Sequence, residues 1–363
     1  MNAYINAYAS QSCAGNTDTL MDAIYKQRSA ITIDSTYIKD TPVGLGKMNN
    51  GDFFTILKDV VAQVLETSNL SNFHDTLLIV GSSVGGMAES ERHFFQDKNY
   101  KNINPKKHII SVIEDTLVEH FSFLSARSIS TACTSSANAL LLAKRLIKVG
   151  AYANILVVGA DELCSTTVCG FHALGVLSSK PCSPFDEARD GMNVAEAVAA
   201  LLIQNRPTKD AVELAGVGAS SDAYHMTNPD PTASGAFSAM KNALEDAAVA
   251  SEKVDYINAH GTGTVANDQV EALGVEKLFD DVYISSTKAI TGHTLGAAGA
   301  LEAVVVCEVI KKGQIPPQTS LKKAENKNIH LATRVYKREI KYALSNSFAF
   351  GGNNTSILFG AVQ

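Results

Sequence analysis

The chain has 363 residues, more than a single hydrophobic core usually serves, so about two domains are expected. Hydrophobic residues make up 45% and charged residues 19% of the sequence, which excludes extended disorder, and the net charge of −6 disfavours a broad nucleic-acid-binding surface. No apolar stretch is as long as a membrane span, no signal peptide is recognisable, and six cysteines form no C-x-x-C pair; together these features predict a cytoplasmic protein with reduced thiols.

The first half of the chain is predicted to alternate strands with helices. Predicted strands cover residues 3–8, 76–80, 155–159 and 198–203, and predicted helices cover 19–28, 53–65, 108–121 and 137–147. The runs at 76–80 and 155–159 are continuously apolar, as is typical of strands buried on both faces. Residues 34–52 contain one proline and three glycines and are expected to form a loop.

The segment 206–210 is the predicted boundary between an N-terminal half, residues 1–206, and a C-terminal half, residues 207–363. Beyond it, predicted helices cover 232–250, with Ser234 as a possible cap, and 297–311, and predicted strands cover 254–258, 282–286, 344–350 and 355–359. Strands and helices alternate in both halves, which predicts a layered α/β fold, although no strong internal repeat is visible.

A candidate nucleophile lies in the small-residue run at 130–137, which contains Cys133. Strong helix formers follow directly, so the thiol is expected at or just before a helix N-terminus. Unpaired N–H groups and the positive end of the helix dipole favour a thiolate there. A buried, inert cysteine is the alternative, and two histidine motifs downstream favour the functional interpretation.

Each of these histidines is predicted to lie at a strand–helix junction. His260 follows the predicted strand 254–258, and His293 lies in a glycine-rich loop before the predicted helix 297–311. Loops at strand ends carry the chemistry of many α/β proteins, although a histidine that only caps a turn is the alternative. Neither histidine has a partner at zinc-ligand spacing, so no metal is expected. One thiol and two neutral imidazoles predict acyl transfer through a thioester, without a cofactor.

Three further motifs have competing interpretations. Residues 81–85, G-S-S-V-G, match a hydrolase nucleophile elbow centred on Ser83, but a glycine-rich turn explains them more simply. Residues 285–288 match S-x-x-K without the other β-lactamase motifs, which leaves Lys288 of interest for its place after a strand. Residues 346–354 place two phenylalanines on a glycine hinge, for core packing or for a loop with free backbone N–H groups.

Taken together, these motifs resemble the β-ketoacyl-[acyl-carrier-protein] synthase family of the thiolase superfamily, close to its KAS I/II-like condensing enzymes. The matching segments, in family order, are T-A-C-T-S at 131–135, P-F-D at 184–186, R-D-G at 189–191, S-S-D-A-Y-H-M-T at 220–227, N-A-H-G-T-G-T at 258–264, residues 285–299 and N-S-F-A-F-G-G at 346–352. The resemblance implies a thiolase-like five-layer α-β-α-β-α fold with two similar halves, usually as a homodimer.

The resemblance also implies a decarboxylative Claisen condensation. Cys133 would accept an acyl chain from acyl carrier protein, and malonyl carrier protein would then lose carbon dioxide and attack the Cys133 thioester, giving a 3-oxoacyl carrier protein. His260 and His293 would stabilise the enolate. The backbone N–H groups of Cys133 and Phe350 would form the oxyanion hole, and Phe350 would also act as a gate between the two half-reactions.

The remaining roles follow from the same resemblance. Lys288, Glu302 and Asp268 would form a charged shell that positions the histidines. Thr262 and Thr264 would hydrogen-bond the pantetheine arm of the carrier protein. Substrate is also expected to contact Phe348 and Gly351, which lie in the same loop as Phe350.

The chain departs from the family in length, because little lies between Ile33 and Phe53 or between Gly86 and Ser128, where acyl pocket and dimer face are usually built. A short or polyene acyl chain is therefore an open expectation, as is a heterodimer with a related ketosynthase.

Three alternatives remain open. The first is a non-catalytic partner like a chain-length factor, which usually lacks the cysteine. The second is a thiolase, which needs a second C-terminal cysteine, and the third is a serine hydrolase using Ser83. Lys106, Lys107 and Lys180 are candidates for docking an acidic carrier protein.

Overall fold

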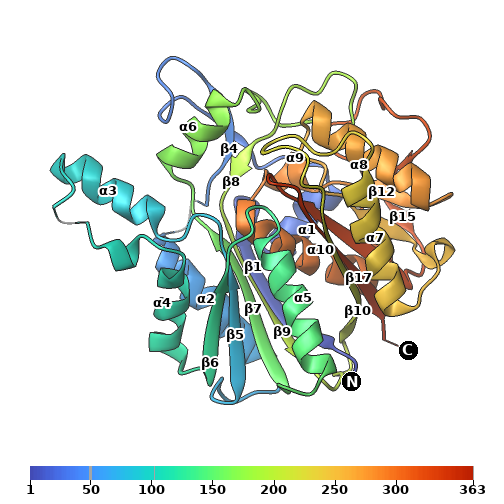
Figure 1. Cartoon of the computed structure of the whole chain (residues 1–363), viewed down its shortest axis with the longest axis horizontal. Coiled ribbons are helices and arrows are strands. Elements are labelled where there is room, and N and C mark those ends of the chain that lie inside the picture. Colours follow the sequence, from blue (N-terminus) through green and yellow to red (C-terminus); the bar gives the residue numbers. More distant parts are fainter. Residues whose placement is uncertain (49–50, 102, 363) are drawn as a thin grey trace.

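Twelve strands form one continuous hydrogen-bonded sheet within residues 1–48, 51–101 and 103–362, the part of the chain that this computed structural model describes (Figure 1). Its strands are β1 (Tyr4–Ser12), β2 (Gly15–Asn16), β5 (Thr76–Gly81), β6 (Ser125–Ile129), β7 (Asn154–Asp161), β9 (Ala197–Gln204), β10 (Val212–Ser221), β11 (Tyr256–Asn258), β12 (Tyr283–Ser285), β14 (His330–Leu331), β16 (Tyr342–Phe348) and β17 (Asn353–Ala361). Two small sheets contain β3 (Thr32–Asp34), β4 (Val43–Gly46) and β8 (Val194–Ala195), and β13 (Gln314–Ile315) and β15 (Tyr336–Lys337).

The helices connect these strands and cover both faces of the sheet. They are α1 (Thr17–Tyr25), α2 (Phe53–Thr67), α3 (Met87–Asp97), α4 (Ser111–Phe121), α5 (Ser135–Lys148), α6 (Ser165–Ala173), α7 (Ser234–Ala247), α8 (Val265–Leu278), α9 (Lys288–Thr291) and α10 (Ala298–Lys312), with 3₁₀ turns η1 (Pro105–Lys107), η2 (Ser251–Lys253) and η3 (Leu295–Ala297). None of the helices in the described ranges combines the length and the apolar character needed to cross a membrane.

The two ends of the large sheet repeat one pairing pattern. On one side, β6, β5 and β7 are parallel neighbours, and β9 and β1 follow as antiparallel strands. On the other side, β12, β11 and β16 are parallel, and β17 and β10 follow antiparallel. The two halves meet where β1 pairs briefly with β10. The two similar halves expected from the sequence are thus present, while the division at residue 206 stays a prediction.

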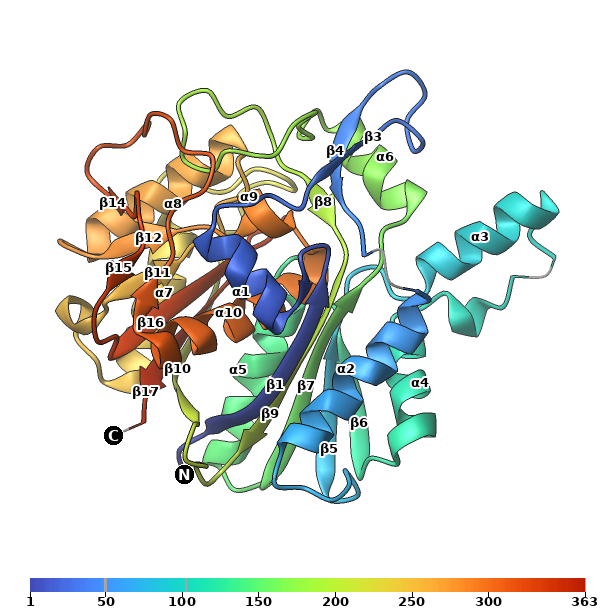
Figure 2. The same cartoon turned by 180° about the vertical axis from the view of Figure 1, so that it is seen from behind.

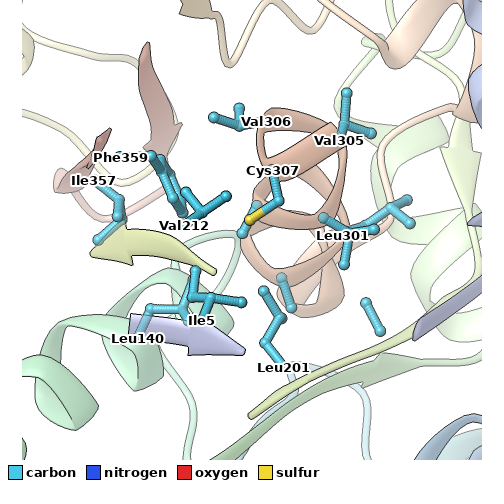
Figure 3. Packing of buried hydrophobic residues seen from close by; sticks show 14 of the residues in the cluster. Ile5, Leu140, Leu201, Val212, Leu301, Val305, Val306, Cys307, Ile357 and Phe359 are labelled. Carbon is cyan, nitrogen blue, oxygen red and sulfur yellow. The ribbon is translucent and has the colours of Figure 1, made fainter. Parts of the chain in front are cut away.

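The order of the layers is given by the helices that pack on each face of the sheet. α5 and α10 lie between the two half-sheets, and the central core joins residues of both (Figure 3): Ile5, Leu140, Leu201, Val212, Leu301, Val305, Cys307, Ile357 and Phe359. α2 and α4 cover the outer face of the first half-sheet, and α7 and α8 cover that of the second (Figure 2). α10 is apolar almost all round because a helix in a middle layer faces core on both sides. The predicted five-layer α-β-α-β-α arrangement is confirmed.

The prediction of a loop over residues 34–52 is wrong in one part, because β4 is a fully buried strand paired with β3 and β8. Its glycines mark close packing rather than a turn. A Cβ atom on Gly46 would lie 2.6 Å from the Cβ of Ala195 and 2.7 Å from the carbonyl oxygen of Thr291.

One other expectation differs from the structure. Ser234 is the first residue of α7 rather than its cap, a place taken by the left-handed Ala233. The segment between Gly86 and Ser128 contains α3, η1 and α4, of which α4 confirms the helix predicted over 108–121, and α3 projects from the body of the molecule (Figures 1 and 2).

Candidate active site

Cys133 lies where the sequence predicts, one residue before Thr134, the N-cap of α5. The residue before it, Ala132, has a left-handed backbone with φ +52°. The carbonyl of Ala132 accepts hydrogen bonds from the backbone N–H and the hydroxyl of Ser135, at 3.1 and 2.6 Å. This tight turn places the thiol at the start of the helix, in a site that leaves it only 8% exposed.

The electrostatics of the thiol differ from the expectation of a stabilised thiolate. Burial raises the pKa of Cys133 to about 11, and the carboxylate of Asp161 acts in the same direction. The Lys288 ammonium and a hydrogen bond from the backbone N–H of Phe350 act in the opposite direction, but they do not outweigh the loss of solvent. Burial therefore opposes the thiolate that the start of the helix favours.

The two histidines come together from separate loops of the C-terminal half. The rings of His260 and His293 lie edge to face, with centroids 5.1 Å apart and an angle of 89°, and each residue is only 2% exposed. Burial and the nearby Lys288 ammonium lower both pKa values well below the usual range, so both imidazoles are neutral. Neither ring nitrogen of His293 has a hydrogen-bond partner among the described residues, which leaves its N–H free for a ligand.

Lys288 connects this pair to a buried carboxylate. Its Nζ donates to Glu302 and lies 3.4 Å from Nδ1 of His260, and Lys288 and Glu302 are 1% and 3% exposed. An ammonium group can only donate, so Nδ1 of His260 accepts and the ring proton resides on Nε2. The expected Lys288–Glu302 pair is thus present, and it fixes the tautomer of one histidine.

Asp268 departs from its expected place in that shell. It accepts hydrogen bonds from the backbone N–H groups of Phe185 and Gly263, and its carboxylate lies 3.4 Å from the guanidinium of Arg189. Its observed partners therefore hold the loop after His260 and do not include either imidazole.

The carboxylate that does hold the histidine loop is Glu271, which the sequence reasoning missed. Glu271 lies one helical turn beyond Asp268 on α8 and accepts from the backbone N–H groups of His260 and Gly261, at 2.8 and 2.7 Å. Burial raises its pKa to about 7. The i, i+3 spacing of the two acids was the available signal.

Cys133, His260 and His293 line one cavity of about 470 Å³. The sequence-predicted residues that line it are Cys133, His260, Thr262, Thr264, His293, Phe348, Phe350 and Gly351. The hydroxyls of Thr262 and Thr264 lie 2.9 Å apart. The aromatic ring of Phe350 lies 5.8 Å from that of Phe171, at the turn between β16 and β17 where Gly351 and Gly352 have positive φ angles.

The other residues singled out from the sequence are Ser83 and three lysines. The hydroxyl of Ser83 donates to the carbonyl of Ala132 at 2.9 Å, which favours the turn over the nucleophile elbow. Lys180 pairs with Asp190 on the cavity wall at 3.0 Å, and Lys107 pairs with Glu89 at 3.5 Å. Neither lysine is a free positive charge. Lys106 lies beside Lys107 in η1.

Comparison with known proteins gives the same family from sequence and from structure. The N-terminal and C-terminal domains of beta-ketoacyl synthase match residues 52–209 and 211–322. The 3-oxoacyl-[acyl-carrier-protein] synthase 2 of Coxiella burnetii is 35% identical over 78% of this chain and 74% of its own length. The protein of that name from Vibrio cholerae is 32% identical over 82% and 79%.

Solved structures agree over almost the whole chain. A ketosynthase–chain length factor complex from Xenorhabdus doucetiae contains a chain with a TM-score of 0.88 and 29% identity, and the match covers 99% of this chain and 98% of that one. A beta-ketoacyl synthase from Burkholderia phymatum has a TM-score of 0.90 and 25% identity over the full length of both chains. The thiolase-like fold is therefore shared, and the chain belongs to the β-ketoacyl synthase family.

Proposed function

We propose that this protein extends an acyl chain by decarboxylative Claisen condensation, joining an acyl group on Cys133 to malonyl-acyl carrier protein to give a 3-oxoacyl carrier protein. The observation that carries the proposal is the cavity that Cys133 shares with two neutral imidazoles, His260 and His293. The names of the relatives, 3-oxoacyl-[acyl-carrier-protein] synthase 2 and beta-ketoacyl synthase, support the same reaction.

The first half-reaction loads the enzyme. The sulfur of Cys133 attacks the carbonyl carbon of the incoming acyl thioester, a carbon–sulfur bond forms, and the carrier's carbon–sulfur bond breaks. Burial holds a proton on the resting thiol, and this proton leaves with the carrier sulfur as its thiol. The backbone N–H groups of Cys133 and Phe350 donate to the transient oxyanion.

The second half-reaction makes the carbon–carbon bond. The malonyl carboxylate leaves as carbon dioxide, and its electron pair passes to the adjacent carbon and the thioester oxygen. His260 and His293 donate to that oxygen, and neutral rings suit this task because they keep their N–H donors without adding a fixed charge. The carbanion then attacks the carbonyl carbon of the Cys133 thioester, the carbon–sulfur bond to Cys133 breaks, and the released sulfur takes up a proton from solvent. Lys288 and Glu302 hold His260 in the donating tautomer.

Carrier-protein substrates would enter past Thr262 and Thr264, whose hydroxyls line the cavity and can hydrogen-bond a pantetheine amide. Phe350 lies on the wall beside Phe171, so its movement would open a path to Cys133. The segments between Ile33 and Phe53 and between Gly86 and Ser128 are shorter than is usual in the family, which supports the proposal of a short or polyene acyl chain. Mass spectrometry of the acyl group trapped on Cys133 would identify that chain.

A dimer is proposed because β6 forms an open edge of the large sheet. Its residues are only partly covered, although its other edge pairs with β5. An unpaired edge strand invites a second strand, here β6 of a second copy or of a related ketosynthase. Native mass spectrometry gives the stoichiometry, and a fully active monomer would exclude this arrangement.

Replacement of Cys133 by alanine tests the reaction itself. Condensation should fall to background while Tm stays within a few degrees of wild type, because the change removes only a sulfur from a small-residue turn. Elongation of acyl carrier protein by purified Cys133→Ala would overturn the proposal. The non-catalytic alternative predicts that the unchanged protein has no activity alone or with carrier proteins.

A further inference from the structure

Asp161, at the end of β7, is a buried carboxylate that the proposed chemistry does not use. Its side chain is inaccessible to solvent, and no lysine or arginine forms an ion pair with it among the residues described. It accepts instead from the Ser82 hydroxyl at 2.5 Å and from the backbone N–H groups of Ser83, Val84 and Gly296, at 3.0, 2.8 and 2.6 Å. Burial raises the pKa of Asp161, and these donors act in the opposite direction, so they are what allows a buried carboxylate without a cation to ionise.

Asp161 and its four donors, here called the Asp161 cluster, are hydrogen-bonded on one side to the turn that carries Cys133. The hydroxyl of Ser83, held in place through its own N–H, donates to the carbonyl of Ala132 at 2.9 Å. Ala132 has the left-handed backbone directly before Cys133. A non-glycine residue in this conformation costs about 1–2 kcal/mol and persists where its surroundings hold it. The chain of bonds from Asp161 therefore ends one residue before the sulfur.

On its other side, the Asp161 cluster is hydrogen-bonded to the loop that follows His293. Gly296 lies three residues after His293, next to Leu295, which is also left-handed with φ +53°. A Cβ atom on Gly296 would come within 2.7 Å of the Ser83 nitrogen and 2.8 Å of the Asp161 carboxylate. The loop that follows His293 is thus packed directly on the cluster.

We propose that Asp161 is a positioning residue that fixes the Cys133 turn and the His293 loop relative to one another. The proposal rests on the proposed function of Cys133 and His293. One carboxylate spans loops from both halves of the chain, and two strained backbone positions flank the reacting groups that it holds. The same negative charge raises the pKa of Cys133, which gives the interaction an independent readout.

Three variants separate the two sides of the cluster. Asp161→Asn removes the charge and offers an N–H where Gly296 needs an acceptor. Ser83→Ala removes only the bond to Ala132. Glu196→Gln is the matched control, because Glu196 is a carboxylate at a neighbouring strand end that accepts from the backbone N–H groups of Met48 and Leu163. Each purified protein is assayed for acyl transfer to Cys133, for decarboxylation of malonyl carrier protein, and for alkylation by iodoacetamide across pH.

In Asp161→Asn, both half-reactions should slow by about 10- to 100-fold, because small displacements of reacting groups carry penalties of this size. KM for the carrier proteins should stay within about twofold, and the pH midpoint of Cys133 alkylation should move down as the charge is lost. Ser83→Ala should slow acyl transfer by about 3- to 10-fold, with decarboxylation unchanged, in line with the loss of one hydrogen bond. Glu196→Gln should leave all three readouts near wild type.

Two results would overturn the inference: wild-type rates and an unmoved alkylation midpoint in folded Asp161→Asn, or equal losses in Glu196→Gln. If Asp161→Asn does not fold, Ser83→Ala decides, and wild-type acyl transfer in that variant overturns the inference. Failure of the proposed function looks different, because Cys133→Ala would then still condense substrates.

Discussion

Replacing Lys288 by methionine should lower both the stability of the protein and its rate of decarboxylation, for two reasons that can be measured separately. Methionine has a similar length but no charge and no donor, so the change removes the bond to Glu302 and the contact with Nδ1 of His260. Lys288 is 1% exposed and Glu302 is 3% exposed, so water cannot replace the lost ammonium.

The cost in stability follows from the charge that is left behind. Glu302 must take up a proton, and protonating a carboxyl group of ordinary pKa 4.5 at pH 7 costs about 3 kcal/mol. Loss of one partner of a buried ion pair typically costs about 3–5 kcal/mol, which agrees. Because the pKa of Glu302 is raised in the folded variant, its protonated form stabilises that variant at low pH and loses this effect as pH rises. The deficit should therefore shrink to about 1 kcal/mol at pH 5.

The cost in activity has a different origin. Without Lys288, His260 is no longer held in the tautomer that donates from Nε2, so decarboxylation should fall by about 10²- to 10³-fold, as for loss of one oxyanion donor. Adding Glu302→Gln should restore stability but leave decarboxylation low. Urea unfolding at pH 5 and pH 7 measures the first effect, and carbon dioxide release from malonyl carrier protein measures the second.

Wild-type decarboxylation by folded Lys288→Met would refute the assigned tautomer. A double variant no more stable than the single one would refute the charge argument.

Three further predictions concern the rest of the site. In Glu271→Gln, which removes the carboxyl group that titrates near pH 7, decarboxylation should keep its rate as pH falls from 7.5 to 5.5, because lowered pKa values keep His260 and His293 neutral; an acid limb near pH 6.5 in that variant would contradict this. Thr262→Val should raise KM for carrier substrates by about 5- to 10-fold with kcat little changed, since one hydrogen bond contributes about 1 kcal/mol; a fall in kcat alone would contradict the pantetheine role. Glu271→Gln should slow decarboxylation more than acyl transfer, because it loosens the His260 loop; equal losses in stopped-flow measurements of both steps would contradict this.

The residues that the sequence revealed are those in short, distinctive motifs. Cys133 and the two histidines could be found because each lies in a run of small residues at a predicted strand–helix junction, where position in the chain implies position in the fold. The alternating pattern of apolar runs likewise predicted most long strands and the layered fold. β4 was missed because glycines that allow close packing and glycines that form turns look alike in one sequence.

The carboxylate of Asp161 was beyond this kind of reasoning. Asp161 contacts residues 78 and 135 positions away, and nothing in its local sequence indicates those partners. The burial that raises the thiol pKa was hidden for a related reason. A helix N-terminus can be inferred locally, whereas the surroundings of Cys133 come from segments as far along the chain as Asn354.

The division of the site between two half-sheets has a consequence for biosynthesis. The sulfur is translated about 130 residues before the first imidazole and more than 200 before the turn that carries Phe350. β17 is made after all the other strands of the sheet, and it pairs with both β10 and β16 and so closes that turn. A nascent chain should thus stay inert towards malonyl thioesters until β17 has been synthesised, and a fragment cut before β17 should have no catalytic activity.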